Sequence, residues 1–220
     1  HGNFSAAQRY QQKGLAIRRK LGDRWGVAAS LSNLGMIPYQ QRDYATAQAY
    51  WEEALQIRRQ LGEEWSLAGS LDNLALVAMG LGRLDAANEL LAQAVALRQK
   101  LNDRQGLAIS LGNWGRLALA EQAWPTAVGR FRRSLQLAHE IGDPLGVVFA
   151  LVGVAAAWIR TGSIRQAVEL LAAAENQLEA INGVWETDEE ALFEASREQA
   201  QAALQNGLFE KSWTLGRALE

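Results

Sequence analysis

The sequence of 220 residues contains no cysteine and only three prolines. Without cysteine, the chain can form no disulfide, no thiolate metal site and no cysteine nucleophile. Its two histidines, His1 and His139, have no metal-ligand spacing to each other, and the sequence has neither a His-Glu-x-x-His pair nor a phosphate-binding glycine loop. We therefore expect no catalytic residue, no metal site, no cofactor and no enzymatic activity.

An excess of charge of either sign is also missing. The 22 basic and 24 acidic residues give a formal net charge of -2, which does not favour a nucleic acid as the partner. Apolar runs such as residues 146–159 are shorter than the roughly 18 residues of a membrane-spanning helix. The first residues lack the pattern of a signal peptide. These absences predict a cytoplasmic protein with no membrane partner.

What the sequence has is a period of forty residues. One short motif recurs at that spacing, as Leu21-Gly22-Asp23, Leu61-Gly62-Glu63, Leu101-Asn102-Asp103, Ile141-Gly142-Asp143 and Ile181-Asn182-Gly183. Self-similarity at such a period is typical of helical hairpins that bury their apolar faces against their neighbours. Function is then expected on the surface that the stacked hairpins create.

Aligned by forty, large and small residues coincide at offsets of three, four and seven. That spacing indicates amphipathic helices and not strands. We expect the glycine or alanine of each first helix to face an alanine of the second, which brings the helix axes to about 8 to 10 Å. The coinciding sets include Leu31, Leu71, Leu111 and Leu151; Gly35, Ala75, Gly115 and Ala155; Trp51, Leu91, Phe131 and Leu171.

The period divides the chain into a single predicted solenoid over residues 1–220. Residues 1–20 match the second helix of a repeat, so we expect the chain to begin within a hairpin, as a fragment of a longer protein would. Full repeats are predicted at residues 23–61, 63–101, 103–141 and 143–181, and a terminal helical pair or cap at residues 185–220.

Basic residues recur on the predicted second helices, for example Arg18, Arg58, Arg98 and Arg130. A stripe of this kind could follow a nucleic acid, and its affinity would then fall steeply with salt. Glutamates interrupt the stripe on the same helices, so we predict a solvated outer face. Adjacent glutamates such as Glu189-Glu190 are also interpreted as solvated, because neighbouring helical residues point about 100° apart.

The repeat resembles the tetratricopeptide repeat (TPR). Its signature can be followed in the order Leu31, Leu34, Gly35, Ala47, Trp51 and Ala54. The forty-residue length is similar to the subtype of kinesin light chains and spindle adaptor proteins, with Pro38 and Gly153 as departures. The resemblance implies an all-α, right-handed superhelical solenoid of antiparallel helix pairs. It also implies a protein or peptide as the partner, bound on a concave wall lined by the first helix of each pair.

The C-terminal motif carries a narrower resemblance. Asn206-Gly207-Leu208-Phe209, followed by Trp213, Gly216 and Arg217, is similar to the end of helical-repeat tails on bacterial signalling ATPases and LuxR-type or SARP-type regulators. This implies that the chain is the C-terminal arm of a larger bacterial signalling or regulatory protein.

The phase of the first helices selects a candidate groove, which the resemblance assigns to a peptide, a helix or another domain of the parent protein. Exposed apolar patches generally mark interaction surfaces, although curvature could instead bury this set as ordinary core. The predicted groove residues are Trp25, Ser32, Asn33, Met36, Tyr39, Trp65, Asp72, Asn73, Leu76, Met79, Ile109, Asn113, Arg116, Phe149 and Ile159.

Two other functions are compatible with the same residues. One is a small-molecule sensor domain of a STAND-type transcriptional regulator, with a sugar or metabolite held against the tryptophans. The other is structural self-association, in which residues 1–20 pair with a second copy of the chain. Neither requires catalysis.

Overall fold

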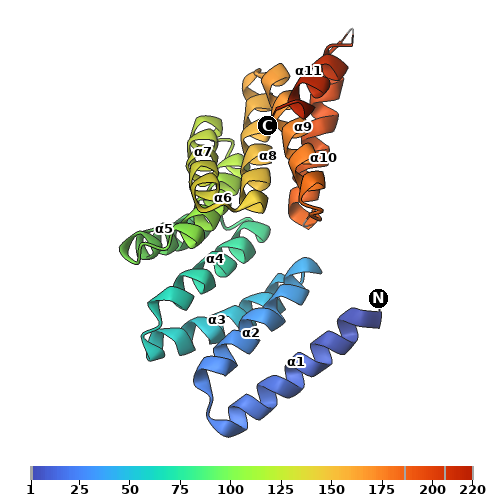
Figure 1. The fold of residues 1–220 in the computed structure, drawn as a ribbon. Coiled ribbons are helices and arrows are strands. Elements are labelled where there is room, and N and C mark those ends of the chain that lie inside the picture. Colours follow the sequence, from blue (N-terminus) through green and yellow to red (C-terminus); the bar gives the residue numbers. More distant parts are fainter. Residues whose placement is uncertain (1, 186, 206, 220) are drawn as a thin grey trace. The chain divides into compact units, whose positions relative to one another are not determined.

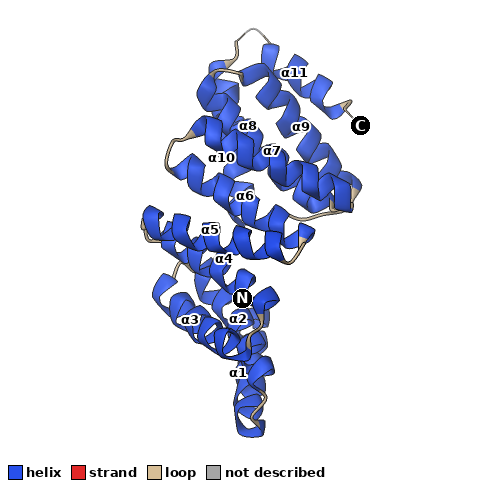
Figure 2. Ribbon diagram, turned by 90° about the vertical axis from the view of Figure 1, so that its left-hand side faces the viewer, coloured by secondary structure: helices blue, strands red, loops and turns tan. Residues whose placement is uncertain are grey.

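The computed structural model describes residues 2–185, 187–205 and 207–219, and the side chains from residue 9 onwards within those ranges. Every regular element in these ranges is an α-helix, so the all-α class is confirmed (Figures 1 and 2). The helices are α1 (Gly2–Leu21), α2 (Arg24–Gln40), α3 (Tyr44–Leu61), α4 (Glu64–Gly80), α5 (Leu84–Lys100), α6 (Arg104–Ala120), α7 (Trp124–Ile141), α8 (Pro144–Thr161), α9 (Ile164–Ala180), α10 (Thr187–Ala203) and α11 (Leu208–Arg217).

The chain divides into two compact units, residues 1–102 and residues 103–220. In the first unit α2 packs with α3 and α4 with α5, while α1 covers α2. In the second unit α6 packs with α7 and α8 with α9. Each unit is thus built from helix pairs joined by short turns. The predicted division of one solenoid into repeats at named boundaries stays a prediction.

Aspartates begin the first helices α2, α6 and α8, as their spacing predicts, whereas Glu63 before α4 makes no side-chain capping bond. The carboxylates of Asp23, Asp103 and Asp143 accept hydrogen bonds from the backbone N–H three residues later, at 2.8 to 3.0 Å. These bonds satisfy donors that a helix N-terminus leaves without an intrahelical partner. At the opposite ends, Gly62 and Gly142 terminate α3 and α7 in the left-handed conformation, with φ of 70° and 69°. The turn chemistry therefore fixes where each pair begins and ends.

The core of a helix pair depends on one large side chain facing one small residue. Trp51 of α3 is fully buried, and a Cβ atom added at Gly35 of α2 would lie 2.3 Å from its ring. Likewise, a Cβ at Gly115 would lie 2.8 Å from the ring of Phe131. The expectation that these glycines face an alanine is therefore wrong, because the aromatic ring of the partner helix occupies that space.

The sizes of the two facing residues, one on each helix of a pair, change together from one repeat to the next. Where the second helix carries an aromatic residue, Trp51 or Phe131, the first helix carries glycine. Where it carries leucine, Leu91 or Leu171, the first helix carries alanine, in both cases fully buried: Ala75 and Ala155. Because protein interiors are close-packed, the extra methyl group of alanine on the first helix is compensated by leucine, in place of a larger aromatic residue, on the second helix. Each hairpin thereby keeps a filled interface.

We predict that Gly35→Ala destabilises the protein by about 1–3 kcal/mol, the usual cost of overpacking a core. In a Trp51→Leu background the same substitution should be neutral or stabilising, because it recreates the alanine and leucine pair of the next repeat. The midpoint of urea unfolding, followed by circular dichroism, measures both effects.

Gly129→Ala is the matched control. This glycine lies inside α7 with no atom within 4 Å of an added Cβ, so alanine should stabilise the helix by up to ~1 kcal/mol. Equal effects of Gly35→Ala with Trp51 and with leucine at position 51 would contradict the proposed size matching.

Arginines on the second helices turn inward and connect neighbouring pairs. The Arg18 guanidinium donates to the Ser30 hydroxyl, and Arg58 donates to the Ser70 hydroxyl one repeat later. Burial of the Arg58 guanidinium lowers its pKa. The predicted solvated face is therefore wrong at Arg58, where a hydroxyl of the following helix satisfies a partly buried guanidinium, whereas Arg18 is exposed.

Arg130 departs from a solvated face in another way. Its guanidinium lies 4.1 Å from the centre of the Trp114 ring and donates to the Trp114 carbonyl at 2.8 Å. Desolvation lowers the pKa of this group as well. Its neighbours Arg132 and Arg133 are exposed. In each of these arginine groups, one member packs against the protein and another faces solvent.

Helix α8 is a longer apolar segment than the run of residues 146–159 that the sequence indicates. Its 18 residues, Pro144–Thr161, are long and apolar enough to cross a membrane by length and composition alone. In the second unit, however, α8 packs against α7, α9 and α10, and Val148 and Val152 lie in the core cluster with Phe193. The contacts of α8 on several sides account for its composition as that of a core helix.

The last two helices pack on different neighbours. Helix α11 lies mainly against α9, with Gly216 so close that an added Cβ would lie 2.2 Å from the Glu169 carbonyl oxygen. Helix α10 lies mainly against α8. The two helices meet at Trp213, whose ring lies 6.4 Å from that of Phe193. Helices α10 and α11 therefore differ from the preceding hairpins, in which the two helices pack along each other.

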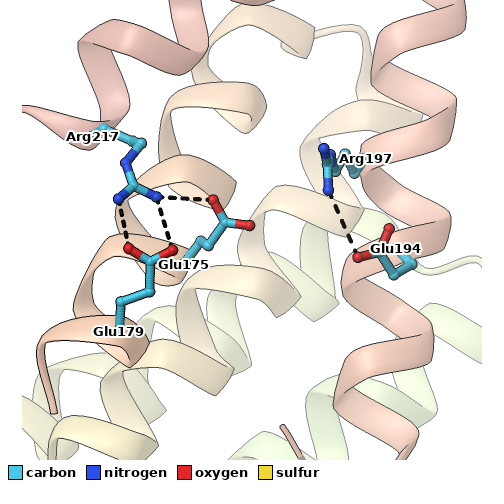
Figure 3. A network of polar contacts seen from close by, with 5 residues as sticks. All are labelled: Glu175, Glu179, Glu194, Arg197 and Arg217. Atoms are coloured by element: carbon cyan, nitrogen blue, oxygen red, sulfur yellow. Dashed lines mark hydrogen bonds and ion pairs between the residues drawn. The ribbon is translucent and has the colours of Figure 1, made fainter. Parts of the chain in front are cut away.

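An ion-pair network holds the end of α11 to α9 (Figure 3). Arg217 contacts Glu179 at 2.6 Å and Glu175 at 3.0 Å. The hydrogen bond from Arg217 lowers the pKa of the Glu179 carboxyl below its ordinary value of 4.5, and the same bond raises the pKa of Arg217. Within α10, Arg197 pairs with Glu194 at 3.8 Å (Figure 3).

We predict that Glu179→Gln loosens α11 at neutral pH and has no effect in acid. A carboxyl whose pKa is lowered by folding stabilises the fold above its unfolded pKa, and that stabilisation is lost as the pH falls through the folded value. The unfolding midpoint of variant and wild type should therefore differ at pH 7 and converge as the pH falls below about 4.5. A difference that persists at pH 2 would contradict the ion-pair explanation.

Candidate partner-binding surfaces

Two tryptophans stand at the same position of consecutive helix pairs. Trp25 in the first turn of α2 is 60% exposed, and Trp65 in the first turn of α4 is 61% exposed. Met36 of α2 is also exposed. It lies on the same side of the helix as Trp25, because residues 11 apart differ by only about 20° in helical phase. We name the set to which they belong the first-unit wall: Trp25, Ser32, Asn33, Met36, Tyr39, Trp65, Asn73, Leu76 and Met79.

The other members of the first-unit wall vary in exposure. Asn33 is exposed, whereas Asn73, Leu76 and Met79 are half-buried. Tyr39 is tied to the core, because its ring lies 5.6 Å from the ring of Trp51 and 5.9 Å from that of Tyr44. The exposed members of the wall are therefore the two tryptophans, Asn33 and Met36.

Ser32 connects the wall to the hairpin core. Its carbonyl accepts a hydrogen bond from the Trp51 indole N–H at 2.9 Å. Its hydroxyl oxygen is buried and has no hydrogen-bond partner in the structure. A wall residue is thus fixed by the same tryptophan that fills the hairpin interface.

Asp72 does not lie on the accessible wall. It is only 3% exposed, and its carboxylate pairs with the Arg98 guanidinium at 2.6 Å, within the first unit. Asp72 is buried, as its inward helical phase suggests, but its negative charge is already paired with the buried guanidinium of Arg98 on α5. The expectation that Asp72 orients a bound partner is therefore corrected.

In the second unit, α10 covers the corresponding wall. Phe149 and Ile159 of α8 pack at the edge of the core cluster that contains Phe193 of α10. Trp185, just before α10, stacks on Phe193 with ring centres 4.7 Å apart. These predicted groove residues are therefore engaged within the chain, which agrees with the alternative that curvature or packing buries part of the set.

A charged contact holds the beginning of α10 in place. Arg116 of α6 lies 2.7 Å from the Asp188 carboxylate and 3.2 Å from that of Glu189, and all three side chains are partly buried. The interpretation of Glu189 as a solvated residue is wrong, because it lies opposite a guanidinium 73 positions earlier in the chain. The remaining predicted residues of this unit are Ile109, which is exposed, and Asn113, which is half-buried.

We predict that Arg116→Met releases the first turns of α10. Methionine stands at the equivalent position 36 of the first unit, so the substitution keeps the helix and removes the charge. Hydrogen bonds to charged groups contribute about 1.5–3 kcal/mol, so backbone amides of α10 should exchange with solvent roughly tenfold faster or more. Hydrogen exchange followed by mass spectrometry measures the change. Amides of α11 are the internal control, and unchanged protection of α10 would contradict the role of Arg116.

A second surface feature of the first unit lies away from the tryptophans. A cavity of about 500 Å³ is lined by residues of α3, α4 and α5 and of the turn between α4 and α5. Its apolar lining includes Leu55, Leu74, Val77, Ala78, Leu81 and Leu90, and its charged lining is Glu52, Arg59 and Arg83. We name it the α3–α5 groove. The phase of the first helices does not predict this groove, because the second helices α3 and α5 supply much of its lining.

The structure also bears on the predicted sensor site, on metal binding and on self-association. No tryptophan lines the α3–α5 groove, so this cavity does not match the predicted sensor site against the tryptophans. Within the described residues there is no group of three or more His, Asp or Glu side chains that could hold a metal ion. Tyr10, Ile17 and Leu21 of α1 are exposed, and self-association through this region stays a prediction.

Comparison with known proteins agrees with the helical pairs. Residues 26–100 match the family model of the tetratricopeptide repeat. This segment of the chain carries tetratricopeptide repeats. No curated protein matches the chain in sequence. The matched segment includes α3, α4 and α5 and nearly all of α2, so the TPR assignment rests on the first unit.

Solved structures extend the TPR likeness to most of the chain. BtubC (BKLC) from P. vanneervenii is similar with a TM-score of 0.69 and 21% identity, over 84% of this chain and 77% of that one. A kinesin-light-chain-like protein of Podosopora anserina with nearly identical TPR-like repeats gives a TM-score of 0.62 and 20% identity, over 86% of this chain and 93% of that one. At these identities the likeness concerns the fold, and it agrees with the kinesin-light-chain resemblance of the forty-residue repeat.

Proposed function

We propose that this TPR chain is a non-catalytic scaffold that binds a peptide, a helix or a partner domain on the first-unit wall. TPR folds in general serve as scaffolds for protein partners, and nothing in the described residues indicates catalysis. The observation that carries the proposal is the exposure of Trp25 and Trp65 at equivalent positions of consecutive pairs.

The energetics of exposed tryptophans support this site. Large aromatic side chains left in water are costly, and tryptophan is enriched among the few residues that dominate binding energy. Met36 and Met79 add unbranched, adaptable side chains to the same wall. Such a surface gains free energy when a partner covers it.

Helix α10 supports the kind of partner proposed. In the second unit it lies on α8 with Phe193 in the core cluster and with its first turn opposite Arg116. A wall made by first helices in this chain therefore accommodates an amphipathic helix. On the first-unit wall, Asn33 and Asn73 offer side-chain amides that can bond the backbone of an extended segment.

A finer proposal concerns the parent protein. The terminal motif, of which Asn206 lies outside the described residues, resembles the ends of helical-repeat arms on bacterial signalling proteins. The absence of cysteine is compatible with a reducing cytoplasm. We propose on this basis that the scaffold is the C-terminal arm of a cytoplasmic bacterial signalling or regulatory protein.

The test uses peptides selected from a displayed random library against the immobilised full chain. We predict that Trp65→Ala weakens the selected peptides about tenfold or more, since truncating a hot-spot residue costs about 2 kcal/mol. Isothermal titration calorimetry gives the Kd, and circular dichroism verifies that the helical content is unchanged.

Leu215→Ala is the matched control for this experiment. Leu215 is also 61% exposed but lies on α11 of the second unit, so its removal should leave the Kd unchanged. Peptides whose affinity is the same for wild type, Trp65→Ala and Trp25→Ala would overturn the assignment of the first-unit wall.

A further inference from the structure

One edge of the first unit gathers the ends of five helices. The helices of this unit alternate in direction, so α1, α3 and α5 end at the same edge at which α2 and α4 begin (Figure 1). Two contacts join these helix ends within the pairs: Arg24 bonds to the Gln60 side chain, and Lys100 pairs with Glu64 at 2.6 Å. We name residues 18–26, 58–66 and 98–102 the first-unit edge.

Two leucines and two tryptophans of the first-unit edge are exposed. Leu21 is 75% and Leu61 39% exposed, and each stands four residues before an exposed tryptophan, Trp25 or Trp65. Of the eight tryptophans, all of which the structure describes, these two alone are exposed. The equivalent positions of the later repeats carry Leu101, Gln105, Ile141 and Leu145. The exposed indole rings of the chain are therefore confined to this edge.

The first-unit edge also carries an excess of basic residues. Its three ranges contain eight lysines and arginines but only three acidic residues. Two of the acidic residues are engaged within the fold, because Asp23 caps α2 and Glu64 forms the ion pair with α5. Among the described residues, Lys20, Arg24 and Arg59 are exposed and have no carboxylate within ion-pairing distance. The accessible surface around the leucines and tryptophans is therefore positively charged.

The opposite edge of the same unit has neither feature. The turns from α2 to α3 and from α4 to α5, residues 37–46 and 77–86, contain two basic and two acidic residues. In these described ranges Leu81, at 40%, is the one exposed large apolar side chain. The hairpin turns as such therefore do not account for the exposed leucines, tryptophans and cations of the first-unit edge.

Tryptophan and leucine beside lysine and arginine are typical of side chains that enter a membrane interface. The indole ring favours the level of the lipid headgroups, where both its apolar body and its N–H are accommodated. Anionic lipids attract basic residues near the surface, and this attraction adds to the burial of apolar area. Stacking on the bases of a nucleic acid would engage the tryptophans and arginines but would leave the two leucines in water.

We infer that the first-unit edge binds the surface of an anionic membrane. Its leucines and tryptophans enter the headgroup region, and Lys20, Arg24 and Arg59 contact lipid phosphates. Such a contact needs neither a membrane-spanning segment nor a signal peptide, the two features on which the expectation of no membrane partner rests. The inference goes beyond the proposed function. The tryptophans belong to the first-unit wall as well, but the leucines and the cations belong to the edge alone.

The experiment uses the full chain and vesicles made of equal parts of phosphatidylglycerol and phosphatidylcholine, with pure phosphatidylcholine vesicles as the neutral comparison. Co-sedimentation gives the partition coefficient. The chain should bind the anionic vesicles about tenfold more tightly or better, and high salt should remove this preference. An absence of binding to the anionic vesicles would overturn the inference.

The depth of the contact is measured by the quenching of tryptophan fluorescence with brominated acyl chains. Trp25 and Trp65 should be quenched in bound protein, because the other six tryptophans are buried or half-buried. A double variant with phenylalanine at both positions should lose the quenching. Binding without quenching in the wild type shows adsorption by charge alone and contradicts the inference.

Leu61→Ser and Leu81→Ser are the matched pair for the apolar contact. The two leucines are exposed to nearly the same extent, 39% and 40%, but lie at opposite edges of the first unit. Leu61→Ser should weaken binding to the anionic vesicles several-fold, whereas Leu81→Ser should leave it unchanged. Equal effects of the two substitutions would place the contact elsewhere and overturn the inference.

The charge is tested with the double variant Lys20→Gln, Arg24→Gln. Its partition coefficient on anionic vesicles should fall about tenfold or more. The double variant Arg42→Gln, Arg83→Gln removes two exposed cations from the opposite edge and is the control, which should bind like wild type. An equal loss in both double variants would show a response to net charge and contradict the placement of the first-unit edge on the membrane.

This inference and the proposed function fail in different ways. Peptides selected on the first-unit wall should bind Leu61→Ser and the Lys20→Gln, Arg24→Gln variant like wild type, because these positions lie outside the wall. Vesicle binding that is insensitive to these variants overturns the inference and leaves the peptide result standing. A single-stranded oligonucleotide is the comparison ligand. If it binds more tightly than the vesicles and its affinity does not depend on Leu61, the edge recognises nucleic acid and the inference is wrong.

Discussion

The packing of one large residue of the second helix against one small residue of the first is the contact on which each helix pair depends. Trp51 leaves no room for a Cβ at Gly35, while Leu91 and Leu171 leave room for the methyl group of an alanine. This exchange of volume keeps both kinds of pair closely packed. Because the interface is filled in either case, substitutions on the other faces of the helices can vary without opening the pair. The surfaces that carry recognition are therefore free to differ from one repeat to the next.

The consequence is that one architecture presents its surfaces differently in the two units. In the second unit α10 lies on α8, and Arg116 binds the acidic first turn of α10. In the first unit the equivalent of Arg116 is Met36 or Leu76, and two tryptophans are exposed. A charged position suits the acidic helix end that the chain itself supplies, whereas an apolar position suits a partner that brings apolar side chains. The same backbone position thus serves two kinds of contact through a single side-chain change.

The periodicity of the sequence predicted the core positions and helix starts that recur from repeat to repeat. It did not predict the ion pairs between residues that are distant in the chain. The helical phase placed Leu31, Ala47 and Trp51 in the core, and local capping chemistry placed the helix starts at Asp23, Asp103 and Asp143. The same phase also selected Asp72, whose burial depends on Arg98 of another helix. The pairing of Arg116 with Glu189 joins residues 73 positions apart, which no window of local pattern contains. Inward arginines such as Arg58 could have been found by noting that Ser70 recurs in phase with Ser30, since a buried cation requires an acceptor.

Departures from the period carry information because the repeat supplies its own reference state. Positions 78 and 118 both carry alanine, whereas the equivalent position 158 carries tryptophan and position 38 proline, and the helix pairs form in every case. A cation at a helix N-cap reduces stability, because the helix dipole opposes it. At the start of α5 this cost falls on Arg83, although Asp43 at the equivalent position of α3 shows that the fold accepts an aspartate cap there. A residue that is unfavourable for the helix it begins, at a position where another repeat carries a favourable one, points to a contact of Arg83 beyond its own helix pair as the reason for its presence.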